Sequence, residues 1–305
     1  MTRLIELPGD FSENGPWGQD GARGNCAQLE EGNILFFPKT PFEMPADDVR
    51  FLLSQQRRGG RIHKNIAYRP SQNRLTGHRG NERAQIAKLR DVLGRYSQQA
   101  IGFAARLLAP YAGSWRVDFA SFRPQQEKGR HLRLRARNDL LHLDSFPTRP
   151  ANGDRILRIF TNLNPSEARV WNTSETFEEL ARRFAGSGAM LLPKALRPPR
   201  RVAFKVARAV GLQSLARPPY DDWMLRFHHF LKANEEFQHS APRSRWGFPP
   251  GSTWLAFTDM VSHAVLSGQF AVEQTLIISR HSLLRPEKAP ITILERMAGC
   301  RLTLD

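Results

Sequence analysis

Short runs of alternating apolar and polar residues recur along this 305-residue chain, on both sides of a long basic segment. An alternation of period two is typical of strands that bury one face. Because such strands resume after the basic segment and a helix precedes them, the order of elements favours a mixed β fold with flanking helices, of the jelly-roll kind. The runs predicted as strands cover residues 114–122, 131–137, 155–165, 167–171, 252–257 and 268–279.

Helices are predicted from apolar spacing and from end signals. The clearest spans Asn81 to Leu108, where apolar residues recur near a period of 3.6. A shorter helix is predicted from Pro45 to Ser54, because proline begins it and two acids lie in its first turn. Further helices are predicted over 175–185, capped by Thr173 or Ser174, and over Tyr220 to Glu236. A short buried strand is predicted from Gly32 to Pro38.

The charge of the chain is strongly positive. Lys and Arg number 45 against 29 Asp and Glu, a net charge of +16, which implies an anionic partner: nucleic acid, an acidic membrane surface or an acidic small molecule. Part of this charge lies in Gln55 to Gly80, a Gly-rich stretch expected to be a loop. Another part lies in Leu191 to Arg217, within a basic helical insertion at about 188–240 of a single domain spanning 1–305.

The cysteines and the N-terminal residues indicate the compartment in which the protein is found. Cys26 and Cys300 form no CxxC pair, which excludes a zinc knuckle and fits a reducing compartment. The first residues show no signal-peptide pattern, and no apolar run approaches the roughly 20 residues of a membrane-spanning helix. We therefore expect a cytoplasmic protein, either soluble or peripheral to a membrane.

His142 and Asp144 are separated by one residue, in the stretch LLHLDSF. In a strand, residues two apart share a face, so the pair predicts two ligands of one metal ion. The alternative is a histidine at a strand end, hydrogen-bonded to a nearby acid. A third ligand would complete a site of two histidines and one carboxylate, typical of non-haem Fe(II) oxygenases. His263 lies 119 residues after Asp144, between two strand-like runs and before a predicted turn at 264–268.

Two long stretches resemble a known family. Residues 140–165 (LLHLDSFPTRPANGDRILRIFTNLNP) and 254–287 (WLAFTDMVSHAVLSGQFAVEQTLIISRHSLLRPE) are similar to the Kdo 3-hydroxylases, which are Fe(II)/α-ketoglutarate-dependent dioxygenases of Gram-negative bacteria. Residues 60–70 and 74–77 resemble the N-terminal part of that family. The resemblance covers most of the chain. It implies a double-stranded β-helix that hydroxylates C3 of a Kdo sugar in the lipopolysaccharide inner core, giving Ko.

The resemblance also implies the roles of particular residues. His142, Asp144 and His263 would bind iron, with O2 and α-ketoglutarate as co-substrates. An arginine beyond the last histidine would pair with the distal carboxylate of α-ketoglutarate, because its planar fork meets a carboxylate with two hydrogen bonds. Gln274 stands eleven residues after His263, and the first arginine, at seventeen, is Arg280. Further candidates are Arg155 and Arg158.

The positive charge then has two expected uses. Kdo is a carboxylated sugar and lipid A carries phosphates, so the basic loop is expected to bind the sugar acid and the insertion to dock on an anionic membrane face. A solvated basic face without a ligand is the alternative. Nucleic acid is not expected, because no reader motif is present. Two other functions stay open: a non-catalytic basic module for lipopolysaccharide or nucleic acid, and an α-ketoglutarate hydroxylase of another acidic substrate. The residues expected to bind the substrate are Arg57, Arg58, Lys64, Tyr68 and Arg69.

Overall fold

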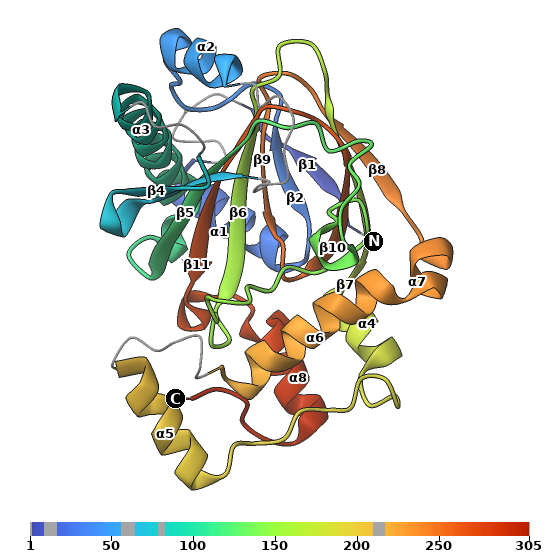
Figure 1. Ribbon diagram of the computed structural model, residues 1–305. Coiled ribbons are helices and arrows are strands. Elements are labelled where there is room, and N and C mark those ends of the chain that lie inside the picture. Colours follow the sequence, from blue (N-terminus) through green and yellow to red (C-terminus); the bar gives the residue numbers. More distant parts are fainter. Residues whose placement is uncertain (1, 9–16, 56–64, 79–82, 210–216, 305) are drawn as a thin grey trace.

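Two β-sheets face each other in the computed structural model, which describes residues 2–8, 17–55, 65–78, 83–209 and 217–304. The strands of the larger sheet follow the order β1-β2-β9-β6-β11-β5-β3-β4, and those of the smaller sheet the order β10-β7-β8 (Figure 1). Only the pair β1–β2 is parallel. The larger sheet comprises β1 Leu4–Glu6, β2 Ile34–Phe37, β9 Thr253–Phe257, β6 Arg155–Asn162, β11 Ala271–Ile278, β5 Trp115–Arg123, β3 Ile66–Arg69 and β4 Arg74–Thr76. The smaller comprises β10 Val261–Ser267, β7 Arg169–Thr176 and β8 Ser244–Phe248.

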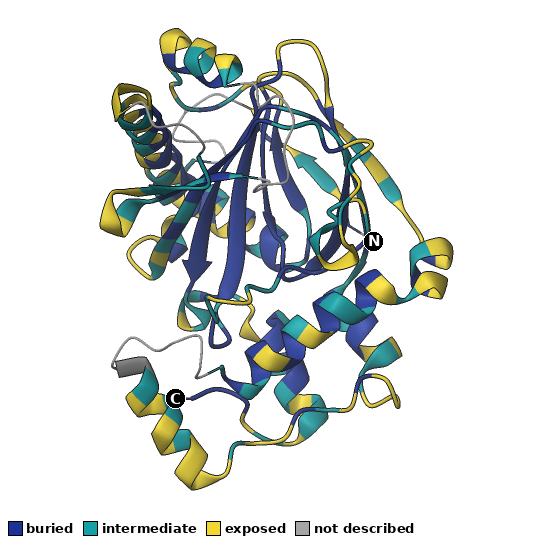
Figure 2. Ribbon diagram, viewed as in Figure 1, coloured by how far each residue is buried: buried dark blue, intermediate teal, exposed yellow. Residues whose placement is uncertain are grey.

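Helices cover the outer face of the larger sheet and its lower end (Figure 1). Helix α3 packs against β5 and β11, and α1 packs against β2 and β9. Since both faces of the central strands are covered, all residues of β6 and β11 are buried, as the dark strands of Figure 2 show. The helices are α1 Gln19–Glu30, α2 Ala46–Ser54, α3 Arg83–Leu107, α4 Phe177–Phe184, α5 Pro198–Ala209, α6 Pro219–Ala233, α7 Glu235–Ser240 and α8 Pro290–Ala298.

The alternation along each strand divides the core in two. On β6, Leu157 and Ile159 join the large core beneath α1 and α3, whereas Phe160 joins a smaller cluster between the two sheets. That cluster is aromatic: Trp171 of β7 and Trp254 of β9 lie 5.6 Å apart, ring centre to ring centre. The aromatic cluster therefore fills one end of the space between the sheets, and the polar side chains described below occupy the remainder.

Most predicted elements are present. Strands β2, β5, β6, β7, β9 and β11 overlap the runs predicted for them, and α2, α3, α4 and α6 overlap the predicted helices. The double-stranded β-helix with flanking helices is confirmed. Within the segment predicted as an insertion, α6 buries Trp223, Phe227 and Leu231 in the main core, so this helix belongs to the body of the protein.

The strand predicted over 131–137 is wrong. This fully described stretch contains only a 3-10 turn, Leu134–Ala136, and the side chain of Leu134 is 45% exposed. The alternation of leucine and arginine has no partner strand; instead the segment lies beside α6, where Lys232 donates a hydrogen bond to the carbonyl of Arg135. Alternation of apolar and polar residues thus occurs here in a segment that does not form a strand.

Two further expectations, the loop at 55–80 and the turn at 264–268, need correction. The described part of the supposed loop, residues 65–78, contains β3 and β4, because Ile66 and Tyr68 have a face to bury against the sheet. The turn predicted at 264–268 is mostly strand, since β10 continues to Ser267 and only Gly268 leaves it, with a φ of +128°.

The cap predicted for α4 was misplaced. Thr173 and Ser174 lie within β7, and the N-cap of α4 is Thr176. The Thr176 hydroxyl accepts the amide hydrogen of Glu179, while the Glu179 carboxylate accepts that of Thr176. This reciprocal capping box satisfies two amides that the helix itself leaves free.

We predict that Glu30→Ala lowers the free energy of unfolding by about 3 kcal/mol, measured by urea denaturation. The Glu30 carboxylate is fully buried and accepts hydrogen bonds from the Tyr111 hydroxyl (2.6 Å) and the amides of Leu284 (2.9 Å) and Arg285 (2.6 Å). Its loss leaves three donors without an acceptor. The matched control is Glu31→Ala, which removes a half-exposed ion pair to Arg285 and is expected to cost less than about 1 kcal/mol. Equal losses for the two variants would contradict this account.

Candidate metal centre

His142, Asp144 and His263 converge between the sheets. One ligand atom from each lies within 4.8 Å of the others, and all three side chains are buried. Within the described ranges, this is the one group of at least three His, Cys, Asp or Glu side chains so placed. The structure thus brings together the three residues singled out in the sequence.

Backbone hydrogen bonds hold these side chains in place. His263 belongs to β10, and the His142 amide donates to its carbonyl (3.1 Å) while the His263 amide donates back to His142 (2.9 Å). The Asp144 amide donates to the carbonyl of Thr258 (2.8 Å). His142 and Asp144 therefore do not belong to a regular strand; a single bridge and one further bond fix their direction.

Both histidines present the same ring nitrogen to the centre. Nδ1 of His142 donates to the carbonyl of Leu140 (2.8 Å), and Nδ1 of His263 donates to the carbonyl of Val261 (2.9 Å). Since a carbonyl only accepts, Nδ1 carries the proton and Nε2 keeps the lone pair that a metal requires. Burial lowers the pKa of both rings, and for His142 the nearby His263 lowers it further, so both are neutral.

Asp144 is held in the ionised form. Burial alone would raise its pKa, but the charge of Arg158 holds it well below the ordinary range. Arg158 donates to one carboxylate oxygen at 2.7 Å, and the other lies 3.7 Å from Nε2 of His142. One oxygen thus faces the histidines while the second is occupied. Two imidazole nitrogens and one carboxylate oxygen fit Fe(II), which this ligand set binds with open positions for co-substrates.

Aromatic and helical residues brace the centre. The Trp171 ring stacks on His263, with ring centres 5.1 Å apart and planes 19° apart. From α6, His228 places its ring edge against His142 at 5.0 Å and donates from Nδ1 to the carbonyl of Leu143 (2.6 Å). The sequence gives no sign of this contact, because His228 adjoins His229 on a helix and the spacing within the helix does not point to His142.

Three buried arginines on inward-facing strand positions form a network that reaches the metal ligands through Arg158. They come from different strands: Arg123 from β5, Arg158 from β6 and Arg169 from β7. Glu273 of β11 pairs with both Arg158 and Arg123, the latter at 2.8 Å. Burial and the charge of Arg123 lower the pKa of Arg169 to about 10. Arg123 and Arg169 were missed in the sequence, where nothing local separates them from the many surface arginines.

Several donors in this region have no acceptor among the described residues. They are Nε of Arg158, Nε of Arg169 and Nε1 of Trp171, all buried. A buried donor without an acceptor costs about 1–3 kcal/mol. Three of them beside a metal ligand set indicate a bound molecule rich in oxygen acceptors.

The other residues proposed to bind the co-substrate face away from the metal ligands. Arg155 is fully buried on the opposite face of β6 from Arg158 and donates to Asp259 at 2.9 Å. Gln274 points toward α3, where it accepts from the hydroxyl of Ser97 (2.7 Å). Arg280 follows β11 and donates to the carbonyl of Asn152 (2.9 Å). Of these candidates, the structure places only Arg158 against the metal ligands.

The residues expected to bind the substrate separate into three groups. Arg57, Arg58 and Lys64 lie outside the described residues. Tyr68 is buried, and its hydroxyl donates to Asn73 (3.2 Å) beneath α3, on the outer side of the sheet. Arg69 faces inward, with its guanidinium 4.7 Å from the centre of the Phe119 ring.

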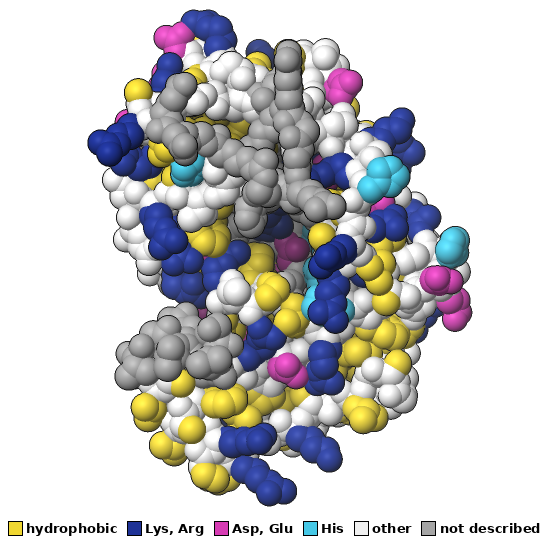
Figure 3. Space-filling view, viewed as in Figure 1, with side chains coloured by type: hydrophobic (Ala, Val, Ile, Leu, Met, Phe, Trp, Pro, Cys, Tyr) yellow, Lys and Arg dark blue, Asp and Glu magenta, His cyan; other side chains and the backbone are white. Residues whose placement is uncertain are grey.

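Arg149 lies across the same ring, in the loop that follows Asp144. Its guanidinium lies 4.2 Å from the ring centres of both Phe119 and Phe146, and it pairs with Asp118. Burial and the charges of Arg158, Arg69 and Arg116 lower the pKa of Arg149 to about 9, which records a local excess of positive charge. Figure 3 shows Lys and Arg side chains gathered around the central hollow of this face.

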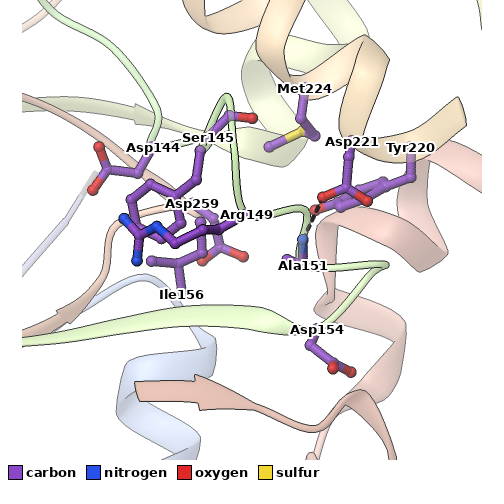
Figure 4. A pocket seen from close by; sticks show the side chains of 11 residues that line it. Asp144, Ser145, Arg149, Ala151, Asp154, Ile156, Tyr220, Asp221, Met224 and Asp259 are labelled. Atoms are coloured by element: carbon purple, nitrogen blue, oxygen red, sulfur yellow. Dashed lines mark hydrogen bonds between the residues drawn. The ribbon is translucent and has the colours of Figure 1, made fainter. Parts of the chain in front are cut away.

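The loop carrying Arg149 is anchored at its far end by α6. The Asp221 carboxylate accepts the amide hydrogens of Ala151 (2.5 Å) and Asn152 (2.9 Å). Figure 4 shows Asp144 and Arg149 on one side of a small pocket and Asp221, with the Ala151 amide, on the other. The loop is therefore fixed at the metal ligand and again eight residues later.

Comparison with known proteins agrees with this geometry. The chain matches the model of the 3-deoxy-D-manno-oct-2-ulosonic acid (Kdo) hydroxylase family over residues 17–301. It is similar to the crystal structure of the Kdo hydroxylase KdoO, a non-heme Fe(II) α-ketoglutarate-dependent dioxygenase, in complex with α-ketoglutarate and Fe(III): 32% identity, 99% of this chain and 98% of the other, TM-score 0.83. The KdoO complex with succinate and Fe(III) is also 32% identical, over 98% and 97%, with a TM-score of 0.82.

No curated protein matches the sequence. The family match covers nearly the whole chain, and the solved relative shares the fold over nearly its entire length. The resemblance seen in residues 140–165 and 254–287 is thereby confirmed, and this chain belongs to the Kdo hydroxylase family.

Proposed function

We propose that this chain, acting as a single domain over residues 1–305, hydroxylates C3 of Kdo in a Kdo–lipid A precursor and gives Ko. Fe(II), α-ketoglutarate and O2 are its cofactor and co-substrates, as the KdoO structures with iron, α-ketoglutarate and succinate support. The observation that carries the proposal is the buried group of His142, Asp144 and His263 next to unsatisfied arginine donors. When bound, iron would supply oxygen activation coupled to the oxidative decarboxylation of α-ketoglutarate.

The protein's own side chains hold and shield the reacting groups. His142 and His263 would bind the ion through Nε2, and Asp144 through the oxygen that Arg158 leaves free. Burial of all three excludes bulk water, which protects a reactive centre from side reactions. The stacked Trp171 ring closes one wall and keeps the His263 imidazole in one orientation.

The inward-facing arginines are the proposed α-ketoglutarate site. Arg123, Arg158 and Arg169 are paired with Glu273 and Glu127, and the Nε donors of Arg158 and Arg169 remain available to a carboxylate of the co-substrate. Arg169 holds the carbonyl of Gly268 with one nitrogen (3.1 Å), and its Nε is free to donate to a carboxylate. Arg158 already binds Asp144, so it links the co-substrate site to the metal ligands.

The pair Arg69 and Arg149 is the proposed site for the sugar carboxylate. Both guanidinium groups lie on the ring of Phe119, and Asp118 is the carboxylate paired with Arg149. Ring contacts keep the two cations in fixed positions at modest desolvation cost, which suits an anion that must be held in one orientation. Because Arg149 and Asp144 line the same pocket, a carboxylate bound at Arg149 would lie near the metal ligands.

Hydroxylation of the sugar tests the proposal directly. Purified protein with Fe(II), α-ketoglutarate and Kdo–lipid A is expected to add one oxygen atom to the sugar, detected by mass spectrometry. His263→Ala is expected to abolish the addition by removing a ligand, while His239→Ala, an exposed histidine on α7, keeps it. An unmodified sugar with iron bound would contradict the proposal, and succinate release without sugar oxidation would indicate a different acidic substrate.

Arg169→Lys is expected to raise the KM for α-ketoglutarate about 10- to 100-fold. Lysine keeps the charge but loses the second hydrogen bond to the carboxylate, worth about 1.5–3 kcal/mol at about 1.4 kcal/mol per factor of ten. Initial rates of succinate formation provide the measurement. Arg155→Lys is the control, because Arg155 is equally buried on the other face of the sheet and is expected to alter stability without altering this KM. An unchanged KM for Arg169→Lys would place the co-substrate elsewhere.

Arg149→Gln is expected to raise the KM for the Kdo substrate about 10- to 100-fold while leaving that for α-ketoglutarate within about twofold. The separate effect on one KM distinguishes a substrate contact from a general loss of structure. Arg226→Gln, which removes an exposed cation on α6, is the control. Parallel rises in both KM values would mean that Arg149 supports the whole site and does not bind the sugar acid.

The substrate carries lipid, so we further propose that the enzyme works peripherally at the inner face of the inner membrane of a Gram-negative bacterium. No helix in the described part of the chain is long and apolar enough to cross a bilayer. Contact with the membrane would therefore depend on a surface element.

A further inference from the structure

Helix α5 exposes two neighbouring valines to solvent. Val202 is 63% exposed and Val206 is 57% exposed, one turn apart on the same side of the helix. The positions that are only half exposed are Arg201, Phe204 and Ala207, which recur every three residues. The helix therefore turns Arg201, Phe204 and Ala207 toward the protein and its two valines away from it.

An ordinary surface helix presents mainly polar side chains to water, whereas α5 also presents two valines there. Four large hydrophobic side chains are exposed among the described residues, and three of them belong to this region: Leu191 (64%), Val202 and Val206. Packing inside the folded chain does not explain why these exposed side chains are apolar. Exposed apolar groups gathered in one place mark an interaction surface.

The charge around these side chains is of one sign. Between Leu180 and Tyr220 the sequence contains no Asp or Glu. The cations of this stretch are Arg182, Arg183, Lys194, Arg197, Arg200, Arg201, Lys205, Arg208 and Arg217. Lys194, Arg197, Arg200 and Lys205 are exposed, and Figure 3 shows hydrophobic and basic side chains intermixed along this lower edge of the molecule.

We propose that α5, together with Leu191, docks this protein on an anionic phospholipid bilayer. The helix lies in the plane of the interface, with Val202 and Val206 in the acyl region and Arg200 and Lys205 at the lipid phosphates. A nucleic acid would use the cations alone and leave the valines in water. Only a surface that is apolar beneath its anionic groups satisfies both features.

The docking surface is connected to the metal centre through the fold. Nε1 of Trp223 on α6 donates to the carbonyl of Leu191 (3.1 Å), and Arg217, just before α6, donates to the carbonyl of Pro147 in the loop between Asp144 and Arg149. The same helix carries His228 against His142. Docking through α5 thus brings a lipid-linked sugar and the site together. The benefit to catalysis rests on the proposed function, whereas the docking itself does not.

Vesicle sedimentation with the full chain tests the proposal. We expect binding to phosphatidylglycerol-rich vesicles at least about tenfold tighter than to phosphatidylcholine vesicles, and weaker as salt rises. The double variant Val202→Asp/Val206→Asp and the double variant Arg200→Gln/Lys205→Gln are each expected to lose about tenfold or more in affinity. Leu134→Asp, an exposed leucine elsewhere, is the control and keeps the parent affinity.

The depth to which α5 enters the bilayer is measured with Val206→Trp. The added tryptophan fluorescence is expected to shift to the blue on anionic vesicles, as it does when an indole ring lies in the membrane interface. Equal binding to neutral vesicles, or valine variants that sediment like the parent, would overturn the proposal. The valine variant is also expected to hydroxylate a water-soluble Kdo substrate at the parent rate. Loss of vesicle binding with this rate intact supports the docking surface, while loss of hydroxylation with vesicle binding intact concerns the proposed function alone.

Discussion

The site depends on a pair of backbone hydrogen bonds that join two distant parts of the chain. His142 and His263 each donate to the carbonyl of the other, across 121 residues of sequence. The bridge places two imidazoles side by side, and the bond from Asp144 to Thr258 adds the carboxylate. Because these bonds are made by the main chain, they are independent of the side chains that must stay free to bind. The ligand set is therefore arranged before any ion arrives.

Buried ion pairs adjoin this ligand set. Three arginines and two glutamates are buried around Asp144, a combination that is costly unless each charge is paired. The pairing is incomplete on the cationic side, where Nε donors of Arg158 and Arg169 have no acceptor among the described residues. A carboxylate of the co-substrate would accept from these donors, so its binding would complete the hydrogen bonds of the buried arginines.

Local patterns were sufficient for part of this structure. His142 and Asp144 were found because ligands two residues apart leave a short-range signal, and His263 because of the stretch around it. The arginines were not, because Arg123 and Arg169 become neighbours of Arg158 only through strand pairing and sheet facing, which depend on contacts between distant residues. The false strand at 131–137 has the same cause: alternation predicts a strand only where a partner is available.

The loop from Asp144 to Asn152 is anchored at both ends and unpaired with any strand between them. Arg158 and Thr258 hold one end, and Asp221 holds the other through two amides. We propose that the middle of this loop, where Arg149 lies, recognises the sugar. Because the anchors lie at its two ends, we expect substitutions in the middle to alter the choice of substrate without displacing the residues that would bind iron.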